Sequence, residues 1–192
     1  SVILTKKGEE GNTLEGVKFD LWRTDGTLIA ENLTTDENGV LKVDDLKPGS
    51  YQFVETETLA GYDLPSEPIP FEIELGQETA LNVEVINDLT TGSVLLTKID
   101  EEGYLLEGAL FDLTDGEGNV LATDPETDED GELFIDGLKP GNYQLIETQA
   151  PYGYELDDEP IPFEIVKAQQ ETLEIVFENL MILGNLKILK VD

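Results

Sequence analysis

The sequence repeats with a period of 92 residues, and this internal repeat constrains the fold more than any other feature. Residues 1–88 align with residues 93–180 without a gap, and about half of the aligned residues are identical. Each copy is long enough to bury a modest hydrophobic core of its own. We therefore predict two domains, at residues 1–90 and 91–182.

A third copy of the repeat begins at the end of the chain. The tail Gly184–Asp192 aligns with Gly92–Asp100 in the same register, so residues 183–192 are predicted to be the start of a truncated third repeat. The chain also opens on an apolar run, Ser1–Leu4, which has the character of a strand interior. We therefore expect the chain to be a fragment of a longer tandem array.

Hydrophobic residues within each copy alternate with polar residues, which is the period of a β-strand with one buried face. Val17, Phe19 and Leu21 show the pattern, and the residues 92 positions later repeat it. Turn sequences such as Asp25-Gly26 separate these short runs. The pattern predicts an all-β fold, with two tandem antiparallel β-sandwich domains of immunoglobulin-like or prealbumin-like type and about seven strands in each.

The composition excludes several classes of protein. The 192 residues include no His and no Cys, which rules out His-based nucleophile systems, zinc sites of the usual type and disulfides. The formal net charge of −32 repels phosphate backbones and anionic membrane surfaces, so we expect no nucleic-acid partner. No apolar run approaches the length of a membrane span, so we expect no membrane insertion. We predict no cofactor and no metal.

Three polar residues in each copy fall in phase with buried apolar residues. In the first strand, Lys6 continues the stripe of Val2 and Leu4, while Glu55 and Asn87 continue similar stripes in a central strand and in the last strand. The second copy repeats all three, at Lys98, Glu147 and Asn179. Buried polar groups are costly unless they satisfy one another, so we expect the three side chains to meet in the core of each domain.

This arrangement has two interpretations. The structural one is a strand-end ion pair between Lys and Glu, capped by the Asn amide. The chemical one is covalent, because burial favours the neutral amine of Lys and the neutral acid of Glu, and a neutral amine is a nucleophile. The acid would hydrogen-bond the carboxamide oxygen, polarise the carbonyl and relay protons to the departing ammonia. The product would be an amide between the Lys and Asn side chains, formed once and without a cofactor.

Several segments resemble the Cna B-type domains, also described as SpaA-like or prealbumin-like, of Gram-positive surface adhesins and pilins. The longest are Asp45–Thr56 (DLKPGSYQFVET) and Gly137–Tyr154 (GLKPGNYQLIETQAPYGY). The block YxLxETxAPxGY is the specific part. It is complete in the second copy, whereas the first copy has Thr58 and Leu59 in place of its Ala and Pro. The resemblance covers both copies.

This resemblance implies an intramolecular isopeptide bond in each domain, between the first-strand Lys and the last-strand Asn, with the Glu of the ET pair as the catalytic residue. By matching motif, the residues implied are Lys6, Glu55 and Asn87 in the first domain and Lys98, Glu147 and Asn179 in the second. It further implies a structural stalk repeat of a surface adhesin or pilin, which is not a turnover enzyme. The location would be extracellular, at the cell surface, with the cell-wall anchor in a region outside this chain.

The expected partners are the neighbouring repeats of the same chain and, through another region of the parent protein, a host extracellular matrix protein. We expect the fragment itself to be a monomer.

Two other functions stay open at this stage. The domains themselves would grip a host matrix protein or a glycan, with Trp22, whose repeat partner is Thr114, as the only hint of such a surface. Alternatively, they would be accessory domains of a secreted hydrolase.

The acidic run Glu126–Gly131 invites a calcium interpretation, but Gly137 stands where an EF-hand loop needs its last Glu, so a solvated turn is favoured.

Overall fold

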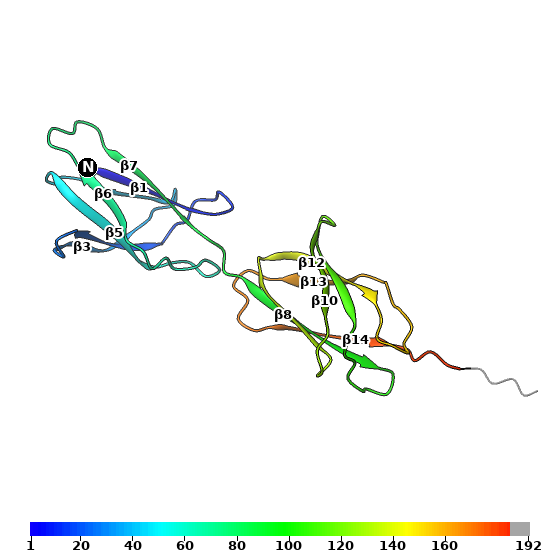
Figure 1. Ribbon diagram of the computed structural model, residues 1–192. Coiled ribbons are helices and arrows are strands. Elements are labelled where there is room, and N and C mark those ends of the chain that lie inside the picture. Colours follow the sequence, from blue (N-terminus) through cyan, green and yellow to red (C-terminus); the bar gives the residue numbers. More distant parts are fainter. Residues whose placement is uncertain (185–192) are drawn as a thin grey trace, which may run out of the picture. The chain divides into compact units, whose positions relative to one another are not determined.

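The computed structural model describes residues 1–184, which form β-strands and loops without any helix (Figure 1). Within these residues there is accordingly no helix long and apolar enough to cross a membrane. The strands fall into two compact units, one ending at Thr90 and the other beginning at Thr91. The all-β sandwich prediction is confirmed. The predicted start of a third repeat lies almost wholly outside the described residues.

The first unit is a sandwich of two sheets. One sheet has three strands in the order β4-β1-β7, and the other has four strands in the order β3-β2-β5-β6. The strands are β1 (Val2–Gly8), β2 (Lys18–Arg23), β3 (Leu28–Thr34), β4 (Val40–Val43), β5 (Gly49–Glu57), β6 (Ile69–Ile73) and β7 (Leu81–Asn87).

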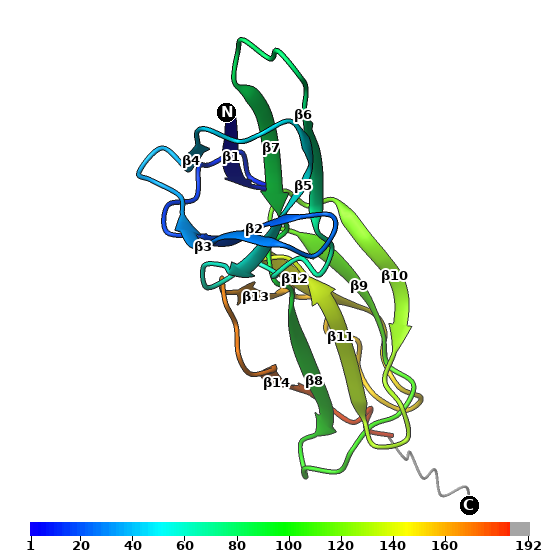
Figure 2. The ribbon, with the colours of Figure 1, turned by 90° about the vertical axis from the view of Figure 1, so that its left-hand side faces the viewer.

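The second unit repeats this topology. Its sheets have the orders β11-β8-β14 and β10-β9-β12-β13, and Figure 2 shows β8 between β11 and β14. The strands are β8 (Gly92–Asp100), β9 (Leu110–Asp115), β10 (Val120–Glu126), β11 (Glu132–Leu138), β12 (Gly141–Gln149), β13 (Ile161–Ile165) and β14 (Leu173–Asn179).

One pairing in each domain departs from the antiparallel arrangement. The first and last strands, β1 with β7 and β8 with β14, run parallel and side by side, whereas every other pairing between the named strands is antiparallel. The parallel register places Lys6 opposite Val85, and Lys98 opposite Phe177. The two ends of each domain's sequence therefore meet within one sheet.

Each sandwich encloses its own hydrophobic core. The strand alternation decides which side chains enter it: in β1, Val2 and Leu4 are fully buried, while Ile3 between them is partly exposed. From the facing sheet, Phe19 and Phe53 pack edge to face with ring centroids 6.0 Å apart. Residues that share the phase of these side chains are consequently placed between the two sheets.

Candidate functional site

The three polar residues that share the core phase come together between the two sheets of each domain. In the first domain, Asn87 lies two residues beyond Val85, the direct partner of Lys6, and therefore on the same face of the sheet. Glu55 reaches the same point from β5 in the opposite sheet. All three are buried, with exposed fractions of 0% for Lys6, 1% for Asn87 and 5% for Glu55.

In the first domain, the Glu55 carboxylate lies between the amine and the carboxamide. Oε2 of Glu55 is 3.3 Å from Nζ of Lys6, and Nδ2 of Asn87 donates a 2.5 Å hydrogen bond to Oε1. Lys6 Nζ also donates to Oδ1 of Asn87. The Glu55 carboxylate thus contacts both the amine that would be the nucleophile in amide formation and the carboxamide nitrogen that would leave.

The second domain has the same three residues in a more open arrangement. Nζ of Lys98 is 3.9 Å from Oε1 of Glu147, and Nδ2 of Asn179 donates a 2.9 Å hydrogen bond to Oε2 of the same carboxylate. The Lys98 amine donates to the Phe177 carbonyl at 3.3 Å and lies 4.4 Å from the centroid of the Phe177 ring. Glu147 and Asn179 are each 1% exposed.

Burial changes the acid–base properties of both lysines. Loss of solvation lowers the pKa of Lys98 to about 8, against the opposing attraction of Glu147. The pKa of Lys6 is lowered from its ordinary value for the same reason, again opposed by the nearby glutamate, Glu55. A larger share of each side chain is therefore the neutral amine at neutral pH than for a lysine in water, and the neutral amine is the nucleophilic form.

One contact differs from the sequence-based expectation. The carboxylate was expected to contact the carboxamide oxygen, but in both domains it accepts a hydrogen bond from the carboxamide nitrogen. The oxygen of Asn87 instead accepts from Lys6. The glutamate therefore lies where it can pass a proton from the amine to the departing nitrogen, rather than where it would polarise the carbonyl.

The sequence did not predict that each carboxamide nitrogen donates a second hydrogen bond, to an acceptor other than the glutamate. In the first domain Thr58 Oγ1 accepts from Nδ2 of Asn87 at 2.8 Å. Its repeat partner is Ala150, and in the second domain the Glu155 carbonyl accepts from Nδ2 of Asn179, also at 2.8 Å. Thr58 was visible in the sequence only as a departure from the motif. The role of a backbone carbonyl leaves no signal in the sequence.

The strand end beside each site is held by a different polar contact in each domain. Asp100 Oδ2 accepts a 3.1 Å hydrogen bond from the hydroxyl of Tyr154. In the first domain Gly8 replaces this aspartate, and a Cβ there would lie 2.6 Å from the ring of Tyr62. Asn12 compensates by donating to the Tyr62 hydroxyl at 3.0 Å.

The remaining candidates from the sequence show ordinary structural roles. Asp128, in the acidic run considered for calcium, accepts hydrogen bonds from the backbone of Asp130 and Glu132, as expected for a turn. Within residues 1–184, no group of three or more potential ligand residues is placed to hold a metal ion. Trp22 is half-buried on β2.

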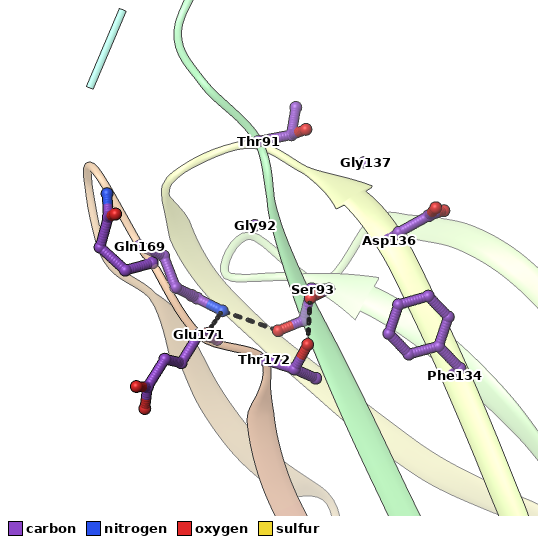
Figure 3. A pocket seen from close by; sticks show the side chains of 10 residues that line it. Thr91, Gly92, Ser93, Phe134, Asp136, Gly137, Gln169, Glu171 and Thr172 are labelled. Atoms are coloured by element: carbon purple, nitrogen blue, oxygen red, sulfur yellow. Dashed lines mark hydrogen bonds between the residues drawn. The ribbon is translucent and has the colours of Figure 1, made fainter. Parts of the chain in front are cut away.

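A shallow pocket of about 400 Å³ lies at the start of β8, whereas Lys98 lies near the end of that strand (Figure 3). Gln169 crosses it and donates to the carbonyls of Ser93 and Glu171, each at 2.8 Å. In the first domain Gln77 makes the matching contacts to Ser1 and Thr79. The polar groups here thus satisfy one another in both repeats. The pocket is the place where a loop is hydrogen-bonded to the start of the first strand of the domain.

Comparison with known proteins identifies the family. The model of the SpaA family, described as a prealbumin-like fold domain, matches residues 1–88 and again residues 92–180. The chain belongs to this family. The two matches cover the two sandwiches, and each contains one complete set of buried Lys, Glu and Asn.

Similar proteins come from bacteria and eukaryotes. The serine-aspartate repeat-containing protein D of Staphylococcus aureus is 29% identical over 174 residues, covering 80% of this chain and 12% of that protein. The human BOS complex subunit NOMO3 is 28% identical over 145 residues, covering 75% and 11%. The structure of the Bacillus anthracis TIE protein is 26% identical, with a TM-score of 0.61, covering 94% of this chain and 34% of that one. The chain thus spans about a tenth of the curated relatives it matches.

Proposed function

We propose that each domain closes an amide bond between its first and last strands, Lys6 to Asn87 and Lys98 to Asn179. The single observation that supports this best is the position of the glutamate in the first domain, with one oxygen toward the amine and the other toward the carboxamide nitrogen. In the structural alternative, the carboxamide only caps the ion pair. A buried pair of this kind is also weak evidence for stability, because desolvation offsets most of the attraction.

The reaction consumes no cofactor. The neutral Nζ attacks the carboxamide carbon, and the glutamate takes a proton from Nζ as the new C–N bond forms. The same carboxyl group then delivers this proton to Nδ2, the old C–N bond breaks, and ammonia leaves. Amine and carboxamide are thereby converted to one amide and one ammonia, and the glutamate returns to its starting state. The fold supplies the rate by holding the groups together.

The amide gives the domain its mechanical role. Because β1 and β7 run side by side at the two ends of the domain sequence, a bond between them carries tension from one terminus to the other. The residues between Lys6 and Asn87 are then bypassed. We propose that the two domains are stalk repeats of a Gram-positive surface adhesin or pilin, displayed outside the cell and anchored through another region. In this role the domains react once and do not turn over substrate.

Intact mass spectrometry tests the proposal. Each bond releases one ammonia, so the purified chain is expected to be lighter than its sequence mass by about 17 Da per bond, or about 34 Da in total. Replacing Glu147 with Gln keeps the size of the side chain but removes the proton relay. E147Q is therefore expected to regain about 17 Da, and the doubly substituted chain, E55Q with E147Q, about 34 Da.

The matched control is Lys7→Met. Lys7 neighbours Lys6, but it is partly exposed and pairs with Glu84 on the outer face of the sheet at 2.7 Å. K7M is expected to retain both bonds, whereas K6M should lose the first. A wild-type chain at its full sequence mass would contradict the proposed reaction, and cross-linked peptides containing Lys7 would contradict the assignment of the nucleophile.

A further inference from the structure

The two glutamates differ in the number of hydrogen bonds that they accept. Oε2 of Glu147 accepts from Nδ2 of Asn179 at 2.9 Å and also from the backbone N–H of Asp157 at 3.0 Å. Among the described residues, the Glu55 carboxylate accepts a hydrogen bond from Asn87 on Oε1, its Oε2 faces the Lys6 amine at 3.3 Å, and no backbone N–H donates to it. The second domain therefore has one extra donor, and it lies on the oxygen that faces the departing nitrogen.

The cause of this difference is a single residue. Asp157 follows Glu147 by ten positions, and the residue ten positions after Glu55 is Pro65. Proline has no N–H, so it cannot donate to the carboxylate. The preceding residue is leucine in both domains, Leu64 and Leu156, and the loop connects the same pair of strands. The first domain thus has a proline at the equivalent position of the equivalent loop, which makes Asp157→Pro the matched substitution.

We propose that the backbone N–H at this loop position slows proton transfer through the glutamate, so that the second domain closes its bond more slowly than the first. This inference rests on the proposed function. An N–H donor favours the charged carboxylate, whereas the relay needs the carboxyl group to take up a proton and pass it on. In the second domain the N–H of Asp157 acts on Oε2, the oxygen that must deliver the proton to Nδ2 of Asn179. In the first domain Pro65 leaves Glu55 free of this restraint.

Other charges near the second site have to be separated from this effect. The carboxylates of Asp157 and Glu178 raise the pKa of Lys98, and Glu147 does so more strongly, all in opposition to its burial. The Asp157 side chain thus also disfavours the neutral amine. A substitution at this position must therefore distinguish the backbone N–H from the side-chain charge. Asp157→Ala removes only the charge, whereas Asp157→Pro removes both.

The experiment follows bond formation in the full chain after a short pulse of cell-free synthesis. Translation is stopped, samples are quenched in acidic denaturant at intervals, and the linked and free lysine peptides of each domain are quantified by mass spectrometry after digestion. The unchanged domain is the internal standard in every sample. The variants are Asp157→Pro, Asp157→Ala and, in the first domain, Pro65→Ala, which introduces the missing N–H.

In the wild-type chain the first bond is expected to form faster than the second. Asp157→Pro should accelerate the second bond by roughly tenfold, because the carboxylate loses one hydrogen bond and takes up the proton from Nζ more readily, and Asp157→Ala by clearly less. Pro65→Ala should slow the first bond. Because D157P is expected to gain rate, a folding defect cannot imitate the result.

Two outcomes would overturn the inference while leaving the proposed function intact. Equal acceleration by D157P and D157A would assign the effect to the side-chain charge, and unchanged rates in D157P and P65A would remove the N–H from the mechanism. A wild-type chain that never loses ammonia would contradict the proposed function itself, and this inference with it.

Discussion

At the scale of single residues, the unusual feature is a fully buried lysine in each core. Lys98 has no exposed surface, and its pKa of about 8 leaves about a tenth of the side chains neutral at pH 7. In an ordinary protein this burial would only cost stability. Here the same desolvation produces the nucleophile that the proposed amide bond requires. The proposed bond would then remove the buried charge that the folded chain otherwise retains.

The cost of this buried charge can be measured in a chain that cannot form the second bond. In Asn179→Ala, we expect Lys98 to keep its lowered pKa of about 8 in the folded state, against its ordinary value of 10.5 when unfolded. Between these two values the unfolded chain binds more protons, so the free energy of unfolding of the second domain is expected to rise as the pH rises. Below about pH 8 the penalty is fully present.

Urea unfolding followed by circular dichroism at pH 7, 8, 9 and 10 measures this dependence. The control is the double variant Lys98→Met with Asn179→Ala, which has no titrating amine in the core. Its second domain is expected to lack this rise. A rise of equal size in the control would assign the pH dependence to other groups.

At the scale of strands and turns, the lysine is held by the turn before the partner strand. Gly131, with φ of +68°, lies against the strand that carries Lys98, whose N–H donates to the Gly131 carbonyl at 2.7 Å. A Cβ at Gly131 would lie 2.8 Å from the Lys98 carbonyl oxygen. The turn therefore needs glycine both for its backbone conformation and for the close approach.

Alanine substitution separates these two requirements. Gly118 also has a positive φ, +87°, but a Cβ there would meet open space. Gly118→Ala should therefore cost only the conformational penalty, about 1–2 kcal/mol. Gly131→Ala should cost about 1–3 kcal/mol more, because the added carbon also displaces the lysine strand. Urea unfolding of both variants measures the difference, and equal losses would show that the close contact is relaxed at little cost.

At the scale of the whole molecule, each amide would join strands that are distant in sequence. The loop from Lys6 to Asn87 contains about 82 residues, and the chain-entropy relation for cross-links assigns about 4.5 kcal/mol to closing it. That is a large share of the stability of a domain this size. A chain without cysteine would thus obtain covalent cross-links that do not depend on the redox conditions outside the cell.

Replacing the two glutamates tests how much the cross-links contribute to the stability of each domain. The chain with both Glu55→Gln and Glu147→Gln should keep its fold and lose about 4.5 kcal/mol of unfolding free energy in each domain. Denaturant titration compares it with the wild-type chain. Equal midpoints in a variant whose mass shows no bond would contradict the stabilising role.

Mechanical stretching provides a separate prediction. When the chain is pulled by its ends in a force spectrometer, the wild-type domains should rupture without releasing the residues between lysine and asparagine. The variant with both Glu55→Gln and Glu147→Gln should extend by the full unfolded length of each domain, because strands that are not cross-linked separate under load. Full-length release by the wild-type chain would contradict the proposed load path.

Much of this architecture could be predicted from the pattern of the repeat. Alternation in β1 placed Lys6 in phase with Val2 and Leu4, and the structure confirms that it is fully buried. The repeat reproduced the same three polar residues in the second copy, and the sandwich brings each set together. The residues left a structural and a covalent interpretation of the set open, and the family resemblance favoured the covalent one, which stays a prediction until the mass of the chain is measured.

By itself, the sequence determined the two domains, their strands and the side chains that enter each core, because alternating burial follows directly from the geometry of a strand. Only the tertiary structure decided which atoms meet. The parallel register of β1 and β7 aligns Asn87 with Lys6, and the fold of a loop brings the N–H of Asp157 to Glu147. Such contacts join segments distant in the chain and often involve backbone atoms, which every residue type except proline provides alike.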